Sequence, residues 1–148
     1  ETLVDGWLRT GDLGVIDASG HLRLLGRAKN MIVTEGGKNV YPEDVEAAFE
    51  RLPCEELCVF SERYLWPERG LGHERLTLVV RPRKQQAPAE LLGQVASANL
   101  RLADYKRIGS YLLWDAEMPR TASMKVKREE LARQIRATEA AAQPLPST

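Results

Sequence analysis

The sequence predicts an α+β fold, with a short and mostly antiparallel sheet, three flanking helices and a β-hairpin in front of them. Strand-length apolar runs alternate along the chain with stretches in which apolar residues recur at helical spacing. Clusters of turn-forming residues separate these runs. At 148 residues, the chain is long enough for one compact domain and some residues of a neighbour or a tail.

The first 28 residues predict a β-hairpin. Two apolar-rich runs, 13–16 and 21–25, flank the turn formers at 17–20. An isolated hairpin is at best marginally stable, so we interpret residues 1–28 as the last strip of a preceding large domain. The chain begins with Glu1 and not with Met, and we therefore expect it to be a piece of something longer.

Residues 29–138 are predicted to form a small C-terminal domain. Pro42 suits the first position of a helix, and Glu43 and Asp44 suit its first turn. The expected strands are 31–33, 39–41, 56–60, 76–80 and 111–114, and the expected helices are 42–53, 91–102 and 128–137.

Two segments have no regular pattern. Residues 61–74 predict a long loop, in which Leu65 and Trp66 either form an interaction patch or fold back on the core. Residues 139–148 are small and rich in proline, and we expect them to be a frayed tail.

The composition argues against several classes of protein. A hydrophobic fraction of 43% and a charged fraction of 28% are ordinary for a soluble globular protein. No apolar run approaches the roughly 18–20 residues that span a bilayer. Lys+Arg and Asp+Glu each total 21, so the net charge gives no argument for a nucleic-acid partner.

The two cysteines, Cys54 and Cys58, lie four residues apart, and a regular strand would place both on the same face. A zinc site would need further ligands at matching spacing, whereas His21 and His73 are isolated. We therefore expect buried thiols and no metal site. Two cysteines without a signal peptide indicate a cytoplasmic location.

Three segments combine charged residues with glycine, proline or other turn formers. The first offers a carboxylate on a tight turn, the second a basic junction and a glycine bend, and the third a lysine on a loop before a helix. They are Thr10-Gly11-Asp12, then Gly26-Arg27-Ala28-Lys29-Asn30 with Gly36-Gly37-Lys38-Asn39-Val40-Tyr41-Pro42-Glu43, and finally Pro119-Arg120-Thr121-Ala122-Ser123-Met124-Lys125-Val126-Lys127-Arg128.

In this order, the segments resemble the last three motifs of the adenylate-forming superfamily, which includes acyl-CoA synthetases, the adenylation domains of peptide synthetases and firefly luciferase. The resemblance covers about 1–130 and is most specific over 11–46. The second segment and the Lys-Val-Lys-Arg end of the third look most like the long-chain or medium-chain fatty acyl-CoA synthetases.

The resemblance implies two half-reactions. A carboxylic acid, here expected to be a fatty acid, attacks the α-phosphate of ATP to give an acyl-adenylate and pyrophosphate, and the thiol of CoA then displaces AMP. Mg²⁺ is expected to accompany ATP, held mainly by a large N-terminal domain and by the substrate phosphates. The C-terminal domain swings between the two half-reactions, so the isolated fragment is expected to be inactive.

The resemblance also assigns roles to residues near the domain junction. Asp12 matches the residue whose carboxylate accepts hydrogen bonds from both ribose hydroxyls of the nucleotide. Arg27 matches the basic residue near the ribose and the phosphates. Lys29 falls at the hinge, where backbone torsions absorb the domain rotation. Without the resemblance, the three would be read as exposed charges.

Further roles fall on the glycine bend and the lysine loop. Gly36 and Gly37 match the loop that approaches the pantetheine arm of CoA, and they equally suit a turn that needs positive φ. Lys125 matches the lysine that bridges the substrate carboxylate and the α-phosphate, where a positioned ammonium stabilises negative charge. Its alternative is a solvated lysine in a basic run. The family commonly has glycine before this lysine, and Met124 departs from that pattern.

Other functions stay open at this point. The acceptor could be a carrier protein in trans instead of CoA, as in acyl-AMP ligases, or the chain could be a stand-alone, non-catalytic module. Several basic residues are weaker candidates for the CoA 3′-phosphate, namely Arg81, Arg83, Lys84, Lys106 and Arg107.

Overall fold

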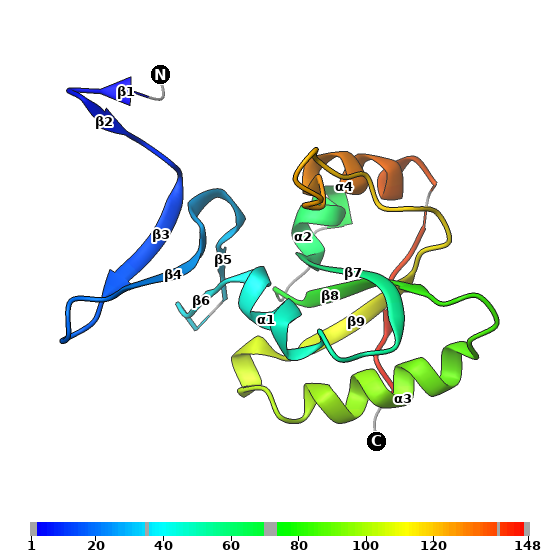
Figure 1. Ribbon diagram of the computed structural model, residues 1–148. Coiled ribbons are helices and arrows are strands. Elements are labelled where there is room, and N and C mark those ends of the chain that lie inside the picture. Colours follow the sequence, from blue (N-terminus) through cyan, green and yellow to red (C-terminus); the bar gives the residue numbers. More distant parts are fainter. Residues whose placement is uncertain (1–2, 35, 70–73, 139, 147–148) are drawn as a thin grey trace.

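The computed structural model describes residues 3–34, 36–69, 74–138 and 140–146, and a four-stranded sheet lies at its centre. The strands of this sheet are β7 (Cys54–Ser61), β8 (Leu76–Pro82), β9 (Ile108–Leu113) and β10 (Gln143–Pro144). The helices are α1 (Pro42–Ala48), α2 (Glu62–Leu65), α3 (Pro88–Asn99) and α4 (Arg128–Ala137). In Figure 1, α1 and α3 lie on one side of the sheet, and α2 and α4 lie on the other.

The sheet is mixed and has the order β10-β9-β8-β7. β7 runs antiparallel to β8, and β10 runs antiparallel to β9. β8 and β9 are parallel, and α3 forms the crossover connection that a parallel pair requires. The predicted α+β class, with a small and mostly antiparallel sheet, is confirmed.

Each face of the sheet has its own hydrophobic core. In β7, Val59 packs with residues of α1 and α3, whereas Cys58 and Phe60 pack with residues of α2 and α4. This alternation is the two-residue period of a strand with both faces covered. The central strands are therefore apolar on both faces, and the sheet forms the middle one of three layers.

The prediction that Cys54 and Cys58 share a face of the strand is wrong. Cys54 packs against the core under α1 and α3, and Cys58 lies in the opposite core. The pairing of β7 with β8 shifts register between Cys54 and Glu56, and the extra residue of such a bulge reverses the alternation of side chains. Both thiols are free, and burial raises the pKa of each above its ordinary value.

The segment predicted as a long loop begins with a short helix. Ser61 caps α2, because its side chain accepts a hydrogen bond from the backbone N–H of Tyr64 at 3.3 Å. Leu65 and Trp66 are buried, so they fold back on the core. A 3-10 turn, η2 (Pro67–Arg69), follows. The remaining loop residues 70–73, with His73, lie outside the described residues.

The other predicted helices exist, with shifted bounds. α1 ends at Ala48 and not near Pro53, because Phe49 leaves helical geometry with φ −105° and ψ 3°. α3 begins at Pro88, three residues before the predicted start, since proline again occupies the first turn. α4 runs over the predicted residues 128–137.

The prediction of a frayed tail is wrong for residues 140–146. Gln143 and Pro144 pair with Tyr111 and Ser110 at the edge of the sheet, and the Tyr111 hydroxyl donates to the Gln143 side chain at 2.7 Å. Leu145 packs against the core under α1 and α3. The strand β10 is held by backbone pairing, which its small residues do not signal.

The N-terminal residues form two hairpins that extend away from the sheet in Figure 1. β1 (Leu3–Val4) pairs with β2 (Trp7–Leu8), and β3 (Asp12–Ile16) pairs with β4 (Leu22–Arg27). The predicted hairpin is thus present as β3–β4, and large apolar side chains of both hairpins are exposed, with Trp7 of β2 at 79% and Ile16 of β3 at 73%. The division of the chain at residues 28 and 29 stays a prediction.

Between the hairpins and α1 lie the 3-10 turn η1 (Ala28–Asn30) and a short hairpin of β5 (Ile32–Val33) and β6 (Asn39–Val40). This hairpin agrees with the two strands predicted around the glycine bend. Among the described residues, no helix is long and apolar enough to cross a membrane.

Candidate functional site

Lys125 lies on a tight loop between the sheet and α4. The loop closes like a hairpin, because Arg120 and Val126 form an antiparallel bridge and the Lys127 N–H donates to the Pro119 carbonyl at 2.7 Å. At the tip, the Thr121 N–H donates to the Lys125 carbonyl at 2.8 Å. The Lys125 side chain is exposed. The backbone of the loop is ordered by its own hydrogen bonds while the ammonium is free to reach outward.

The residue before Lys125 has a left-handed backbone. Met124 has φ +64°, and its N–H donates to the Thr121 carbonyl at 2.9 Å to close the turn. A side chain with a Cβ is disfavoured there, whereas glycine adopts this conformation without strain. The departure at Met124 therefore leaves the shape of the turn intact at a cost in backbone strain.

We expect Met124→Gly to stabilise the protein by about 1 kcal/mol, because it removes this strain and the lost side chain is exposed. Thermal unfolding should show a Tm about 2–4 °C higher. Met124→Ala is the matched control, since it removes the same side chain but keeps the Cβ. A gain in Met124→Ala equal to that in Met124→Gly would contradict the explanation by strain.

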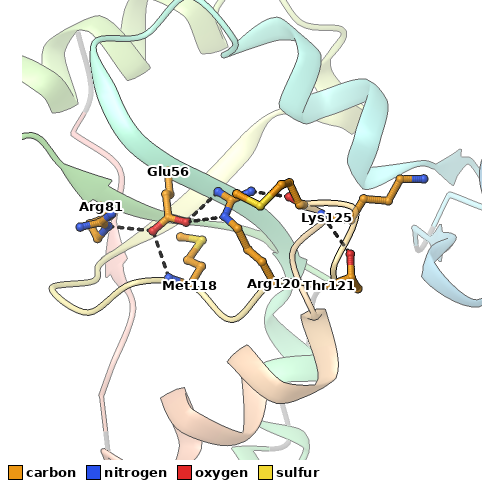
Figure 2. A network of polar contacts seen from close by, with 7 residues as sticks. Glu56, Arg81, Met118, Arg120, Thr121 and Lys125 are labelled. Atoms are coloured by element: carbon orange, nitrogen blue, oxygen red, sulfur yellow. Dashed lines mark hydrogen bonds and ion pairs between the residues drawn. The ribbon is translucent and has the colours of Figure 1, made fainter.

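A buried carboxylate connects the loop to the sheet. Glu56 of β7 is 9% exposed, and its Oε1 accepts hydrogen bonds from Arg120 Nε at 2.9 Å and Arg120 Nη2 at 2.7 Å. Its Oε2 accepts from Arg81 Nε at 2.7 Å and from the Met118 N–H at 3.0 Å. Figure 2 shows Glu56 between the two guanidinium groups, with the Lys125 ammonium pointing away from them. Both oxygens of the carboxylate are satisfied.

The pKa of Glu56 is lowered by this environment. Burial alone would raise the pKa of the carboxyl, but the hydrogen bond from the Met118 N–H and those from Arg120 and Arg81 favour the charged form and outweigh it. Glu56 is therefore an anion at neutral pH, and its bonds to both guanidinium groups are charge-assisted.

A second ion pair, largely but not fully buried, holds the other end of the loop, where α4 begins. Arg128 Nη2 donates to Glu46 Oε1 of α1 at 2.6 Å, and Arg128 Nη1 donates to the Val59 carbonyl of β7 at 2.5 Å. Glu46 Oε1 also accepts from the Val59 N–H at 2.7 Å. The guanidinium carbon lies 5.6 Å from the centre of the Phe60 ring. Burial raises the pKa of Glu46, and the charge of Arg128 opposes that rise.

The structure brings Asp12 and Arg27 together. They are directly opposite each other in the β3–β4 hairpin, and Arg27 Nε lies 3.2 Å from Asp12 Oδ1. Arg27 also donates to the Thr10 carbonyl, so its guanidinium spans the turn at Gly11, which has φ +75°. A carboxylate and a guanidinium thus stand side by side on an exposed edge.

Lys29 lies in η1, where the chain passes from the N-terminal hairpins to the rest of the molecule. Its ammonium contacts Glu129 Oε1 of α4 at 3.1 Å, and both side chains are about 70% exposed. Such an exposed pair is weak, typically below about 1 kcal/mol. Next to it, Asn30 Nδ2 donates to Glu43 Oε1 at 2.7 Å and ties the segment to α1.

Gly36 and Gly37 form the bend of the β5–β6 hairpin. Gly37 has φ +70°, so the turn needs a glycine there, whereas a Cβ at Gly36 would meet no atom within 4 Å. Gly36 lines a shallow groove of about 360 Å³ beside the start of β8. Its other lining residues carry both positive and negative charges: Thr34, Lys38, Glu74, Arg75, Leu76, Asp104, Tyr105 and Arg107.

The five basic candidates for a phosphate contact do not form one patch. Arg107 lines the groove beside Gly36, but Arg81 is bound to Glu56. Lys106 contacts Asp44 of α1 at 3.3 Å. Arg83 and Lys84 are exposed on the segment after β8.

The predicted site residues lie on four different segments. Asp12 and Arg27 lie in the β3–β4 hairpin, Lys29 lies in η1, the glycine bend lies beside the start of β8, and Lys125 lies on the loop before α4. Within the described ranges, no cluster of three or more His, Cys, Asp or Glu side chains suits a metal ion.

The sequence motifs did not reveal the carboxylates that anchor the lysine loop, Glu46 and Glu56. A signal for Glu56 existed, since a charged residue inside the apolar strand 56–60 needs a buried partner. Arg120 and Arg128 stood in the third motif without an assigned partner. Their pairing could not be read from local spacing.

Comparison with known proteins gives the class of this chain. No protein-family model matches it. It is 40% identical over 146 residues to 4-chlorobenzoate–CoA ligase from Arthrobacter, which covers 99% of this chain and 26% of that protein. It is 34% identical to a fatty acid–acyl-carrier-protein ligase from Streptomyces coeruleorubidus, in an alignment that covers 88% of this chain and 24% of that protein. It is 31% identical to a long-chain-fatty-acid–CoA ligase from Mycobacterium tuberculosis, in an alignment that covers 90% of this chain and 25% of that protein.

Solved structures similar to this chain are CoA synthetases as well. o-Succinylbenzoate CoA synthetase from Bacillus subtilis, in complex with its acyl-adenylate intermediate, matches 98% of this chain and 26% of its own at 27% identity, with a TM-score of 0.67. A Mycobacterium tuberculosis fatty acyl CoA synthetase matches 93% of this chain and 26% of its own at 30% identity, with a TM-score of 0.59.

The chain belongs to the adenylate-forming family. More particularly, it matches the C-terminal region of acid–CoA ligases, and it spans about a quarter of the length of these relatives.

Proposed function

We propose that this chain is the C-terminal portion of an ATP-dependent, AMP-forming acid–CoA ligase, to which it supplies Lys125 as the adenylation lysine. The observation that supports this most is the lysine loop, which is closed by its own backbone hydrogen bonds and is tied to the rest of the domain through Glu56 and Glu46, while it presents an exposed ammonium. The 40% identity to a CoA ligase, over nearly the whole chain, supports the same function.

In this proposal, Lys125 stabilises the negative charge that develops when the substrate carboxylate attacks the α-phosphate of ATP. Asp12 accepts hydrogen bonds from the ribose hydroxyls, and Arg27 beside it adds positive charge near the phosphates. Mg²⁺ would be held mainly by the ATP phosphates and by other parts of the enzyme.

We propose that Lys125 moves relative to Asp12 and Arg27 between the two half-reactions. We place the pivot at Lys29, since η1 connects the two parts and its side chain makes only an exposed ion pair. In the second half-reaction, Gly36 and Gly37 would admit the pantetheine arm. Lys38, Arg75 and Arg107 of the adjoining groove carry charge suited to the phosphates of CoA.

Two further questions are which carboxylic acid the enzyme activates and which molecule accepts the acyl group. The sequence motifs favour a fatty acid, whereas the 40% identity to 4-chlorobenzoate–CoA ligase supports an aryl acid as a second candidate. The relative that loads an acyl carrier protein supports a carrier as an alternative acceptor. We also propose a cytoplasmic location, because both cysteines are free thiols.

The test is an assay of pyrophosphate release by the full-length protein with ATP, Mg²⁺ and a panel of fatty and aryl acids. We expect release with at least one acid and acyl-CoA formation after CoA is added. The isolated chain is the control and should be inactive. Acylation of a carrier protein but not of CoA would select the alternative acceptor, and tight binding of ATP or CoA by the isolated chain, without any ligase activity of the whole, would favour a binding module.

A further inference from the structure

We propose that Glu56 and Arg120 are positioning residues that fix the direction in which Lys125 points. The contacts run from β7 through the Glu56 carboxylate and the Arg120 guanidinium to the peptide bond in front of Lys125. The inference rests on the proposed role of Lys125 and concerns side chains that the motif resemblance left without a role.

The peptide unit between Met124 and Lys125 is held at both edges. The Met124 carbonyl accepts a hydrogen bond from Arg120 Nη1 at 2.6 Å, and the Lys125 N–H donates to Thr121 Oγ1 at 3.2 Å. Because a peptide unit is planar, two bonds on opposite edges fix its orientation. The Lys125 carbonyl is bound as well, by the Thr121 N–H at 2.8 Å. The Cα of Lys125 therefore lies between two fixed peptide units, which set the direction of its side chain.

Arg120 can hold the Met124 carbonyl only because Glu56 holds Arg120. Two nitrogens of its guanidinium, Nε and Nη2, donate to the same oxygen of Glu56, and the third, Nη1, donates to the carbonyl. The guanidinium is planar and rigid, so fixing two of its nitrogens fixes the direction of the third. Glu56 itself is buried in β7 and cannot turn without losing its bonds to Arg81 and Met118.

Packing does not replace this clamp at the tip of the loop. Met124 is 67% exposed, and the side chains of Thr121, Ser123 and Lys125 are exposed as well. Thr121 and Ser123 bond to each other through their hydroxyls at 3.0 Å, which ties the tip to itself and not to the sheet. Arg120 is thus the side chain at the tip that links its backbone to Glu56.

Arg81 provides a matched comparison. It also donates to Glu56, through Nε at 2.7 Å, but it lies on β8 and, among the described residues, forms no hydrogen bond with the loop. Arg81→Ala and Arg120→Ala each leave the buried Glu56 carboxylate with one guanidinium partner fewer. Only Arg120→Ala also releases the Met124 carbonyl.

The experiment uses the full-length protein and measures the two half-reactions separately. Acyl-adenylate formation is followed in single turnover, and thiolation is followed by adding CoA to preformed acyl-adenylate. We expect Arg120→Ala to slow adenylate formation by about 10–100-fold, as misplacement of a catalytic group by about 1 Å does, and to leave thiolation nearly unchanged. Arg81→Ala should lower Tm by a similar amount while adenylate formation stays close to that of the wild type.

Arg120→Lys covers the case in which Arg120→Ala does not fold. Lysine keeps the charge beside Glu56, but a single ammonium cannot reproduce the three-pronged contact, so adenylate formation should again fall selectively. Added guanidinium ion, at a concentration that leaves the Tm unchanged, should partly restore adenylate formation in Arg120→Ala and not in Arg81→Ala.

Three outcomes overturn the inference while the proposed function stands: wild-type adenylate formation in folded Arg120→Ala, an equal loss in both half-reactions, or an equal adenylation defect in Arg81→Ala. If the wild-type protein forms no acyl-adenylate, the proposed function itself is wrong. The two failures are therefore distinguishable from the same set of measurements.

Discussion

Lys125→Ala is expected to slow acyl-adenylate formation by the full-length protein by about 10²–10³-fold, the usual cost of removing one preorganised group that stabilises transition-state charge. The reason is that the two guanidinium groups nearest in the motif are already engaged and cannot replace it. Arg120 is bound to Glu56 and Met124, and Arg128 is bound to Glu46 and Val59. Thiolation of preformed acyl-adenylate should be nearly unchanged, because the lysine acts on the first half-reaction.

Lys127→Ala is the matched control. Lys127 is an exposed lysine on the same loop, and its backbone N–H, which the substitution keeps, closes the loop onto the Pro119 carbonyl. Single-turnover assays should show adenylation close to the wild-type rate in Lys127→Ala. Equal losses from the two lysines would indicate a general effect of basic charge, and equal losses in both half-reactions of Lys125→Ala would argue against its assigned role.

Arg128→Ala is expected to lower the free energy of unfolding by about 2 kcal/mol, since it leaves the largely buried Glu46 carboxylate without its partner. It also removes the hydrogen bond to the Val59 carbonyl and the contact with the Phe60 ring. Because Arg128 is the first residue of α4, the loss should fall on the packing of that helix. Urea unfolding of the 148-residue chain, followed by circular dichroism, measures the change.

Two controls make this prediction specific to the buried pair. The double variant Glu46→Leu with Arg128→Met leaves no unpaired charge and should recover much of the lost stability. Arg133→Ala breaks the exposed pair with Glu130 on the same helix and should cost less than about 1 kcal/mol. A loss in Arg133→Ala as large as that in Arg128→Ala would show that helix propensity, and not the buried pair, sets the effect.

Local pattern was sufficient for most of the fold. The β3–β4 hairpin follows from turn formers between apolar runs, and the start of α1 follows from Pro42. The motifs also located the Asp12–Arg27 pair and the lysine loop, because those residues lie in short segments of fixed order.

The rest depends on contacts between residues far apart in the sequence. Glu56 meets Arg81 across 25 residues and Arg120 across 64, so no periodicity within a window can reveal the cluster. The bulge that separates the environments of Cys54 and Cys58 is a property of the pairing with β8. β10 forms because the edge of β9 accepts it, although proline and small residues predict no strand.

The short strand β10 also affects how the molecule behaves towards other chains. An unpaired outer strand offers a row of free N–H and C=O groups, onto which a foreign strand can add and start aggregation. β10 occupies that position on β9, and its Pro144 has no N–H to extend the ladder further. The strand β10 therefore covers one edge of the sheet, and a truncation before Gln143 would leave the backbone of β9 exposed along that edge.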